Sequence, residues 1–271
     1  MTDKNNISLI QPYLLLKACC YHRICRNNTG ISEFYQFTIP DNGQSQFYAV
    51  PDGSVDIVFG INDNDICVMI GGTVLKVKKW IFSPGRTYFG VRFQPGQYLL
   101  PDGLTVHELV NNDLTWNVNK YNAKLAEQIS MKKTIQERAS LFLDFYNTNF
   151  SEVQDTAHNI ERYIRRRIYE TKGNISIKSL CEETGYSACY LRRSFEQIHG
   201  ISPKLFERFI RFQNMLHCIK YGEKNNRMNE LAVLCGYYDQ AHMIKDFRQF
   251  AGQTPDEYRS LLLEHTMELK S

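Results

Sequence analysis

The sequence predicts an α+β protein of two domains: a small antiparallel β-barrel with following helices, then an all-helical carboxyl-terminal domain. Between residues 33 and 93, short runs of aromatic and β-branched residues are broken by turn residues about every ten positions, which is typical of a small barrel or sandwich. After Pro101 the apolar residues recur at helical spacing, and between Ile175 and Arg259 one helical unit occurs twice. A chain of 271 residues can form two domains with cores of their own.

Composition narrows the class of protein. Apolar residues make up 43% of the chain and aromatic residues 13%, which indicates a globular rather than a disordered protein. No apolar run approaches the ~20 residues that span a bilayer, and the polar start lacks the apolar segment of a signal peptide. We therefore expect a cytoplasmic protein without membrane contact. The eight cysteines contain no Cys-x2-Cys pair, so we expect reduced thiols, no metal site and no cofactor.

Seven runs are the candidate strands of the barrel, separated by turn sequences such as Pro51-Asp52-Gly53. They are Phe34–Ile39, Gln46–Val50, Val55–Ile61, Ile66–Ile70, Thr73–Val77, Lys79–Phe82 and Thr87–Phe93. Residues 7–25 are interpreted as an opening strand or a short helix. These segments make up a predicted sensor domain, residues 1–110.

The middle of the chain is predicted to be helical, with a short helix at Thr105–Val110 and amphipathic helices at Tyr121–Ile129 and Thr134–Tyr146. The apolar faces of the last two can pair with a second subunit or pack on their own barrel. We expect a homodimer, with residues 111–150 as its helical dimerisation and linker segment. The polar stretch Asn147–Asp155 indicates a linker. Residues 151–271 form the last predicted domain, which opens with a helix at His158–Glu170.

The repeated unit occurs with a nearly constant offset. The first copy contains Leu180, Gly185-Tyr186-Ser187, Leu191, Phe195, Gly200, Ser202-Pro203 and Phe206; the second contains Leu231, Gly236-Tyr237, Asp239, Met243, Phe247, Gly252, Thr254-Pro255 and Tyr258. The offset is 51 residues before the internal turn and 52 after it. Each copy predicts a short helix, a glycine turn, a capped second helix and a glycine at that helix's end. Pro203–Tyr221 is predicted as a long helix that joins the copies.

The pattern Gly-Tyr-Ser-x3-Leu-x3-Phe-x4-Gly-x-Ser-Pro-x2-Phe, which begins at Gly185, resembles the DNA-binding domain of the AraC/XylS transcription regulators. This resemblance implies two helix-turn-helix motifs that read adjacent major grooves of promoter DNA. It also implies an amino-terminal cupin-like barrel that senses a small molecule. Val50-Pro51-Asp52-Gly53 and residues 90–96 resemble one such sensor class, although the His-x-His metal motif of enzymatic cupins is absent.

A recognition helix buries one face and offers the other to the major groove. The residues predicted to face DNA are Ala188, Cys189, Arg192 and Arg193 in the first copy, and Gln240, Ala241, His242, Ile244 and Lys245 in the second. Arg192 and Arg193 can each pair with O6 and N7 of guanine, and the alternative is that one of them holds a phosphate. The second copy is expected to make fewer base-specific contacts than the first and to serve more in positioning the protein on the DNA.

Further phosphate contacts are predicted at Ser187, Asp239 and Arg248. Residues 160–260 carry seventeen Lys or Arg and twelve Asp or Glu, an excess of positive charge that suits a phosphate-binding surface. Arg165, Arg166 and Arg167 either touch phosphates or form a solvated basic face; the sequence leaves both open.

The barrel is rich in aromatic residues, of which some must be core. An apolar cavity with a few polar groups is the usual small-molecule site. The candidate effector pocket consists of Phe34, Tyr48, Trp80, Arg86, Tyr88 and Arg92, with the two arginines as anchors for a carboxylate or phosphate.

These observations favour an effector-responsive transcriptional activator that is not an enzyme and has RNA polymerase as a candidate partner. Three alternatives stay open: a cupin isomerase or dioxygenase, an alkylation-repair methyltransferase that shares this DNA-binding domain, and a constitutive DNA-binding protein whose barrel only dimerises. The first needs clustered ligands, which His22 and His107 do not supply. The second needs a zinc-held cysteine, for which Cys19, Cys20 and Cys25 are poorly spaced.

Overall fold

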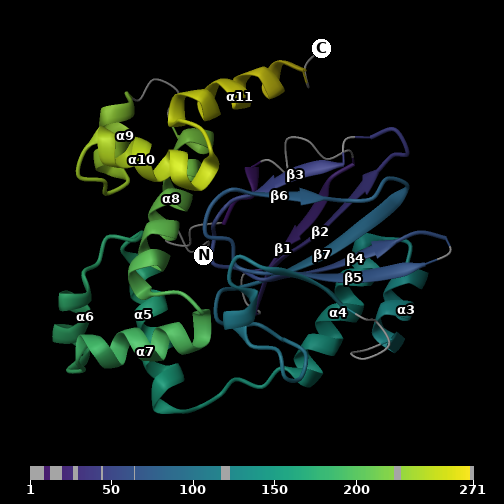
Figure 1. The fold of residues 1–271 in the computed structure, drawn as a ribbon, viewed down its shortest axis with the longest axis horizontal. Helices are drawn as coiled ribbons and strands as arrows, with labels where there is room; N and C mark the ends of the chain where they lie inside the picture. Colours follow the sequence, from purple (N-terminus) through teal and green to yellow (C-terminus); the bar gives the residue numbers. More distant parts are fainter. Residues whose placement is uncertain are drawn as a thin grey trace.

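The computed structural model describes residues 9–12, 20–26, 30–43, 45–63, 65–116, 123–222 and 227–268. An antiparallel sheet domain precedes a helical domain, and the two lie side by side (Figure 1). Among the described residues, no helix is long and apolar enough to cross a membrane. The predicted α+β class with two domains is confirmed.

Six strands form the main sheet in the order β1-β2-β7-β4-β5-β8, and two more form a separate pair, β3 with β6. The strands are β1 (His22–Cys25), β2 (Ile31–Ile39), β3 (Gln46–Ala49), β4 (Asp56–Ile61), β5 (Ile66–Gly71), β6 (Lys78–Ile81), β7 (Arg86–Phe93) and β8 (Asp113–Trp116). Every described pairing is antiparallel. No hydrogen-bonded closure joins the two sheets in the described part of the chain, so the predicted barrel is not confirmed.

Alternation along the strands gives the main sheet two apolar faces. One face buries Phe34 and Phe89 under the helices α3 (Ala123–Met131) and α4 (Ile135–Asn149). The other buries Tyr35, Phe37 and Tyr88 against the β3–β6 pair. The sheet is therefore the middle layer of its domain, with helices on one side and two strands on the other (Figure 1).

The two middle helices lie close to their predicted positions, but their apolar faces are not free. Ile129 of α3 and Phe142 of α4 are buried in the cluster that covers the sheet. Thr134 begins α4 with a capping box to Glu137, as its sequence permits. Buried Arg138 donates to the Ile129 carbonyl and to Gln36 of β2, which ties both helices to the sheet. The apolar faces of α3 and α4 therefore pack on the sheet of their own domain, which is the second of the two alternatives that the sequence left open.

Two strand predictions need correction. Thr73–Val77 is irregular because Asn111 N–H donates to the Thr73 carbonyl at 2.7 Å and the Thr73 hydroxyl donates to the Ser54 carbonyl at 3.2 Å, so this segment packs on a turn. Residues 7–25 were predicted as an opening strand or a short helix, and His22–Cys25 within them forms strand β1, so the strand alternative is confirmed there; residues 7–8 and 13–19 lie outside the described residues. Strand β8 was not predicted. Strand β8 extends the sheet past residue 110, and η1 (Val106–Leu109) matches the predicted short helix.

The helical domain contains α5 (Thr156–Glu170), α6 (Ile177–Thr184), α7 (Ala188–His199), α8 (Pro203–Tyr221), α9 (Met228–Leu234), α10 (Gln240–Ala251) and α11 (Pro255–Glu268). Helix α8 runs between the α6–α7 unit and the α9–α10 unit (Figure 1). Its residues Phe206, Phe209, Phe212 and Met215 are completely buried and join both units into one core. The two repeated units are therefore fixed relative to each other through one helix.

Candidate nucleic-acid interface

Each repeated unit is a helix-turn-helix built with the same local chemistry. Gly185 (φ +74°) and Gly236 (φ +79°) turn the chain after α6 and α9. Ser187 caps α7 by accepting from Tyr190 N–H at 3.3 Å, and Asp239 caps α10 by accepting from His242 N–H at 2.7 Å. Both side chains are thus committed to capping, but they remain exposed at the helix ends where a phosphate would approach.

Helix α7 buries one face and exposes the other. Leu191 and Phe195 are completely buried, as their spacing predicts. Cys189, Arg192 and Arg193 are exposed and Ala188 is half-buried. Neither arginine has an ion-pair partner among the described residues, so both guanidinium groups are available for a nucleic acid.

Helix α10 offers a less charged surface. Gln240, Ala241, Lys245 and Arg248 are exposed, whereas Met243 and Phe247 are buried. Two of its DNA-facing candidates are only half exposed. Ile244 packs against the helical core, and His242 meets the Tyr237 ring edge-on at 5.4 Å. Asp246 is turned inward, where Arg208 holds it at 2.7 Å.

The three consecutive arginines of α5 are used inside the domain. Arg165 pairs with buried Glu161 at 2.7 Å, and Arg167 pairs with Glu183 at 2.8 Å. Arg166 remains mostly exposed, 3.7 Å from Glu170. The sequence left open whether these arginines touch phosphates or form a solvated basic face. Of the three, Arg166 is the one whose side chain remains mostly in solvent.

The sheet domain touches the carboxyl end of each recognition helix. Gly200 ends α7 and Gly252 ends α10, both in the left-handed conformation. A Cβ placed on Gly200 would lie 2.6 Å from Val110 Cγ2, and one on Gly252 would lie 3.1 Å from Val77 Cγ1. Close to the first contact, His107 of η1 lines a surface groove together with Cys189, Arg192 and Arg193. The sheet domain therefore lies beside the residues predicted to read DNA.

A buried polar pair lies under the sheet domain at the end of α7. His199 donates from Nε2 to Glu161 Oε1 at 2.7 Å, and its Nδ1 has no hydrogen-bond partner among the described residues. A Cβ on Gly96 of the sheet domain would lie 3.1 Å from His199 Cε1, and the Tyr98 ring meets the imidazole edge-on. Sequence reasoning missed this pair because Glu161 and His199 are 38 residues apart.

A second link joins the sheet domain to α8. Gln213 is completely buried, accepts from Ile10 N–H at 2.7 Å and donates to the Pro51 carbonyl at 2.9 Å. Gln11 accepts from Val50 N–H at 2.9 Å and donates to Asp52 at 2.8 Å. The segment Val50-Pro51-Asp52 is thereby hydrogen-bonded to the helix that carries both helix-turn-helix units.

The six candidate effector residues do not share one cavity. Phe34 is in the core under α4, and Tyr88 and Trp80 are in the cluster on the opposite face of the sheet. Tyr48 packs against the helical core. Arg86 forms an ion pair with Asp65.

Arg92 is also committed elsewhere, because it is completely enclosed by carboxylates. It bonds Asp56 at 2.8 Å and Glu33 at 2.6 Å, and Asp52 lies 3.7 Å away. Burial raises the pKa values of Glu33 and Asp52, against the opposing attraction of Arg92. As an anchor for a bound anion, Arg92 would first have to lose these partners, so we revise its assignment to a structural one.

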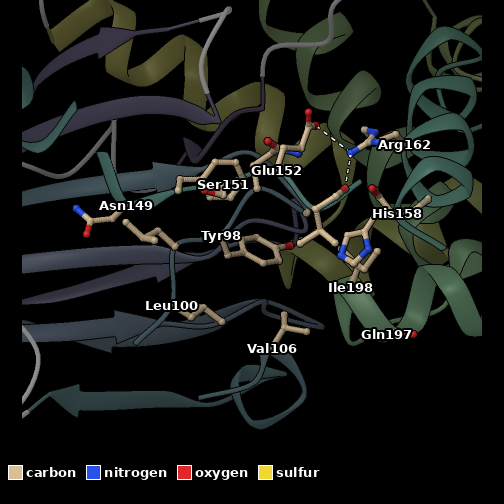
Figure 2. Close-up of a pocket in the computed structure, with 16 residues that line it drawn as sticks. Tyr98, Leu100, Val106, Asn149, Ser151, Glu152, His158, Arg162, Gln197 and Ile198 are labelled. Atoms are coloured by element: carbon tan, nitrogen blue, oxygen red, sulfur yellow. Dashed lines mark hydrogen bonds and ion pairs between the residues drawn. The ribbon is translucent and has the colours of Figure 1, made fainter. Parts of the chain in front are cut away.

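A cavity of about 410 Å³ lies between the domains (Figure 2). Tyr98, Leu100 and Val106 line it from the sheet domain, and His158, Arg162 and Ile198 line it from the helices. Arg162 pairs with Glu152 at 3.2 Å and donates to the Val153 carbonyl at 3.2 Å, both in the segment that connects the domains. No sequence pattern predicts this cavity, since its walls come from five separate segments.

Two helix-turn-helix units on one buried connecting helix define a DNA-binding protein. Residues 180–260 match a family described as a helix-turn-helix domain. The chain is a helix-turn-helix transcriptional regulator, and its DNA-binding domain is similar to that of the AraC type.

Three known proteins resemble it. The uncharacterized HTH-type transcriptional regulator YbfI of Bacillus subtilis (strain 168) is 25% identical over 259 residues, which cover 90% of this chain and 91% of YbfI. The HTH-type transcriptional activator RhaR of Pectobacterium carotovorum is 24% identical over 107 residues, or 40% of this chain and 37% of RhaR. A solved structure of ToxT from Vibrio cholerae is 12% identical and aligns with 89% of this chain and 98% of ToxT, with a TM-score of 0.44.

Proposed function

We propose that this regulator is an effector-responsive activator that inserts α7 and α10 into successive major grooves of promoter DNA. Successive grooves on one side of B-form DNA are ~34 Å apart, and one buried helix, α8, holds both units. The observation that carries the proposal is the shared design of the two units: each presents exposed cations on a capped helix whose far end rests on the sheet domain.

Arg192 and Arg193 read bases, and Lys245 and Arg248 mainly hold phosphates. An arginine can donate two parallel hydrogen bonds to guanine, whereas a lysine is a point charge that suits a phosphate. Ala241 offers only apolar contact to a thymine methyl. The first unit therefore supplies most of the sequence specificity, and the second fixes the register along the duplex.

The sheet domain controls DNA binding through its contacts with Gly200, Gly252 and Gln213. A ligand shifts this control only if it binds two domain arrangements with different affinity. The cavity beside Tyr98 and Arg162 meets that condition better than the aromatic interior of the sheet domain, because its walls belong to both domains. An amphipathic acid fits its lining: the carboxylate would replace Glu152 at Arg162, and the apolar part would contact Leu100 and Val106. Homodimerisation and contact with RNA polymerase stay predictions.

The DNA-binding test uses a fragment recovered by genomic footprinting and measures affinity by fluorescence anisotropy. Arg192→Ala with Arg193→Ala should weaken binding of this fragment by about a hundredfold or more, since each arginine–guanine pair contributes ~1–3 kcal/mol. Arg166→Ala is the matched control, because it removes an exposed arginine from α5. Equal losses in the control and in the α7 variant would mean that α7 does not read the sequence.

The control of DNA binding by the sheet domain is tested with Gln213→Leu. This change keeps the side-chain volume and removes the hydrogen bonds to Ile10 and Pro51. Amide hydrogen exchange should rise in β3, α8 and the Val50–Asp52 segment, and DNA affinity should change with it. If exchange rises while DNA affinity and reporter activity stay at the level of the unchanged protein, the domain contact does not govern binding.

A further inference from the structure

Two cysteine thiols meet in the second helix-turn-helix unit. Cys218 lies on the last turn of α8, and Cys235 directly follows α9. Cys218 is half-buried and packs on the core cluster that contains Cys235, which is completely buried. Both side chains belong to this one cluster, and each thiol is close enough to the other to shift its pKa, so the two sulfur atoms are neighbours.

The repeat explains why these positions meet. Helices α5 and α8 end 51 residues apart, at Glu170 and Tyr221, and α6 and α9 begin with the same offset. The counterparts of Cys218 and Cys235 in the first unit are therefore Arg167 and Thr184. Arg167 forms an ion pair with Glu183, the neighbour of Thr184, at 2.8 Å. Both units thus join the preceding helix to the end of the first helix of the motif, one by charges and the other by thiols.

The two thiols differ in reactivity. The hydrogen bond from Cys235 lowers the pKa of Cys218 to about 7, with burial opposing and Lys172 assisting this shift. The hydrogen bond to Cys218 and burial raise the pKa of Cys235 well above its ordinary value. The thiolate is the reactive form of cysteine. Cys218 is half-buried and has the lower pKa, so it is the thiol that reacts first with a small oxidant.

We propose that Cys218 and Cys235 form a redox-sensitive pair that a hydroperoxide converts into a disulfide between α8 and α9. The Cys218 thiolate attacks one peroxide oxygen, the O–O bond breaks, and the products are a sulfenic acid on Cys218 and hydroxide. Cys235 then gives up its proton and attacks the Cys218 sulfur, forming the S–S bond and releasing water. The two thiols lose two electrons, and each molecule of hydrogen peroxide yields two molecules of water.

The disulfide acts on the geometry of the second unit. Cys235 immediately precedes Gly236, the glycine of the turn that leads into α10. A covalent link to α8 limits the movement of this turn and therefore of the second recognition helix. The first unit has no cysteine at either equivalent position, so the oxidant affects one unit and leaves the other unchanged.

The experiment treats the purified full-length chain with hydrogen peroxide and maps its peptides by mass spectrometry without reduction. A Cys218–Cys235 disulfide should form at low peroxide, and dithiothreitol should reverse it. It should also raise Tm by roughly 5 °C or more, since it closes a loop of intermediate length. Cys218→Ser should abolish the linked peptide and the Tm rise. Cys189→Ser, which removes an exposed thiol, should leave both unchanged.

Oxidation at another cysteine without this linkage, or a sulfenic acid on Cys218 that never proceeds to a disulfide, would overturn the proposal. A second variant tests the geometry separately from the native thiols. Arg167→Cys with Thr184→Cys, made in a Cys218→Ser background, places the same pair in the first unit. A disulfide between the two substituted positions is expected there, and its absence in a folded variant would show that the repeat does not bring these positions within bonding distance.

Discussion

The two helix-turn-helix units share a backbone design but differ in how they pack near the recognition helix. In the first unit, Glu161 of α5 meets His199 of α7 in a buried polar pair. With the offsets of the repeat, the equivalent residues of the second unit are Phe212 and Ala251, both apolar and buried. The fold therefore does not require a polar pair at this place. The pair occurs in the unit whose recognition helix ends under Gly96 and Tyr98 of the sheet domain.

The difference teaches that a repeat can keep its geometry while one copy becomes sensitive to its surroundings. A buried pair of ionisable groups contributes little net stability, because removing charge from water offsets the attraction, yet losing one partner is costly. The apolar pair of the second unit carries no ionisable group, so its contribution to stability does not depend on protonation. The first unit is therefore the one whose stability depends on protonation and on contact with the sheet domain, and the second depends on the state of its thiols.

The largest effect is expected from breaking the polar pair. Glu161→Ala leaves His199 and Arg165 without their shared carboxylate and should lower the free energy of unfolding by ~3–5 kcal/mol. Copying the second unit, with Glu161→Phe and His199→Ala together, should recover most of that loss. Urea denaturation of the three proteins provides the measurement. A double variant as unstable as the single one would mean that the two units are not equivalent at this position.

The same pair predicts a pH dependence with a definite sign. Burial lowers the pKa of His199 below its ordinary 6.5, against the attraction of Glu161. Burial alone would raise the pKa of Glu161, but the hydrogen bonds from His199 and Arg165 outweigh it, so the pKa falls below 4.5. Both groups bind protons more readily in the unfolded chain. Their contribution to stability is therefore complete above about pH 6.5 and is lost as the pH falls, first through His199 and then, below about pH 4.5, through Glu161.

The measurement is Tm as a function of pH for the unchanged chain and for the Glu161→Phe, His199→Ala variant. The slope between pH 7 and pH 5 should be smaller in the variant, because the group that resists protonation has been removed. Identical slopes would assign the acid sensitivity to groups other than this pair. The buried carboxylates Glu33 and Asp52 around Arg92 are not such groups, because their raised pKa values favour the folded state as the pH falls.

A smaller contrast is expected between the two recognition helices. Arg193→Ala should weaken binding to the specific site by ~1–3 kcal/mol and leave nonspecific DNA almost unaffected. Lys245→Ala should weaken both by a similar few-fold factor and reduce the dependence of log affinity on log salt by about one. Anisotropy titrations on specific and random DNA at several salt concentrations separate these outcomes. Should Lys245→Ala relax specificity more than Arg193→Ala, the division of roles between the units is reversed.

The sequence predicted the helical domain more closely than the sheet domain, and the reason is local chemistry. Caps and turn glycines such as Ser187, Asp239 and Gly200 act within a few residues, so their pattern reveals the helix ends directly. Strand partners and domain contacts depend on residues far apart in sequence. The link between Ile10 and Gln213 spans 203 positions, and no local pattern indicates it. Arg92 illustrates the same limit, because Glu33 and Asp56 become its neighbours only once β2, β4 and β7 pair.

The smallest effect is expected from the two glycines that end the recognition helices. Gly200→Ala and Gly252→Ala both place a Cβ on a left-handed residue, which costs ~1–2 kcal/mol. At Gly252 the new methyl group would lie 3.1 Å from Val77, a contact that a small side-chain movement relieves. At Gly200 it would lie 2.6 Å from Val110, so the η1 segment must move away from α7. Gly200→Ala should therefore destabilise the full chain more and increase amide exchange in η1, whereas equal changes in both variants would mean that the sheet domain contacts the two helix ends with equal tightness.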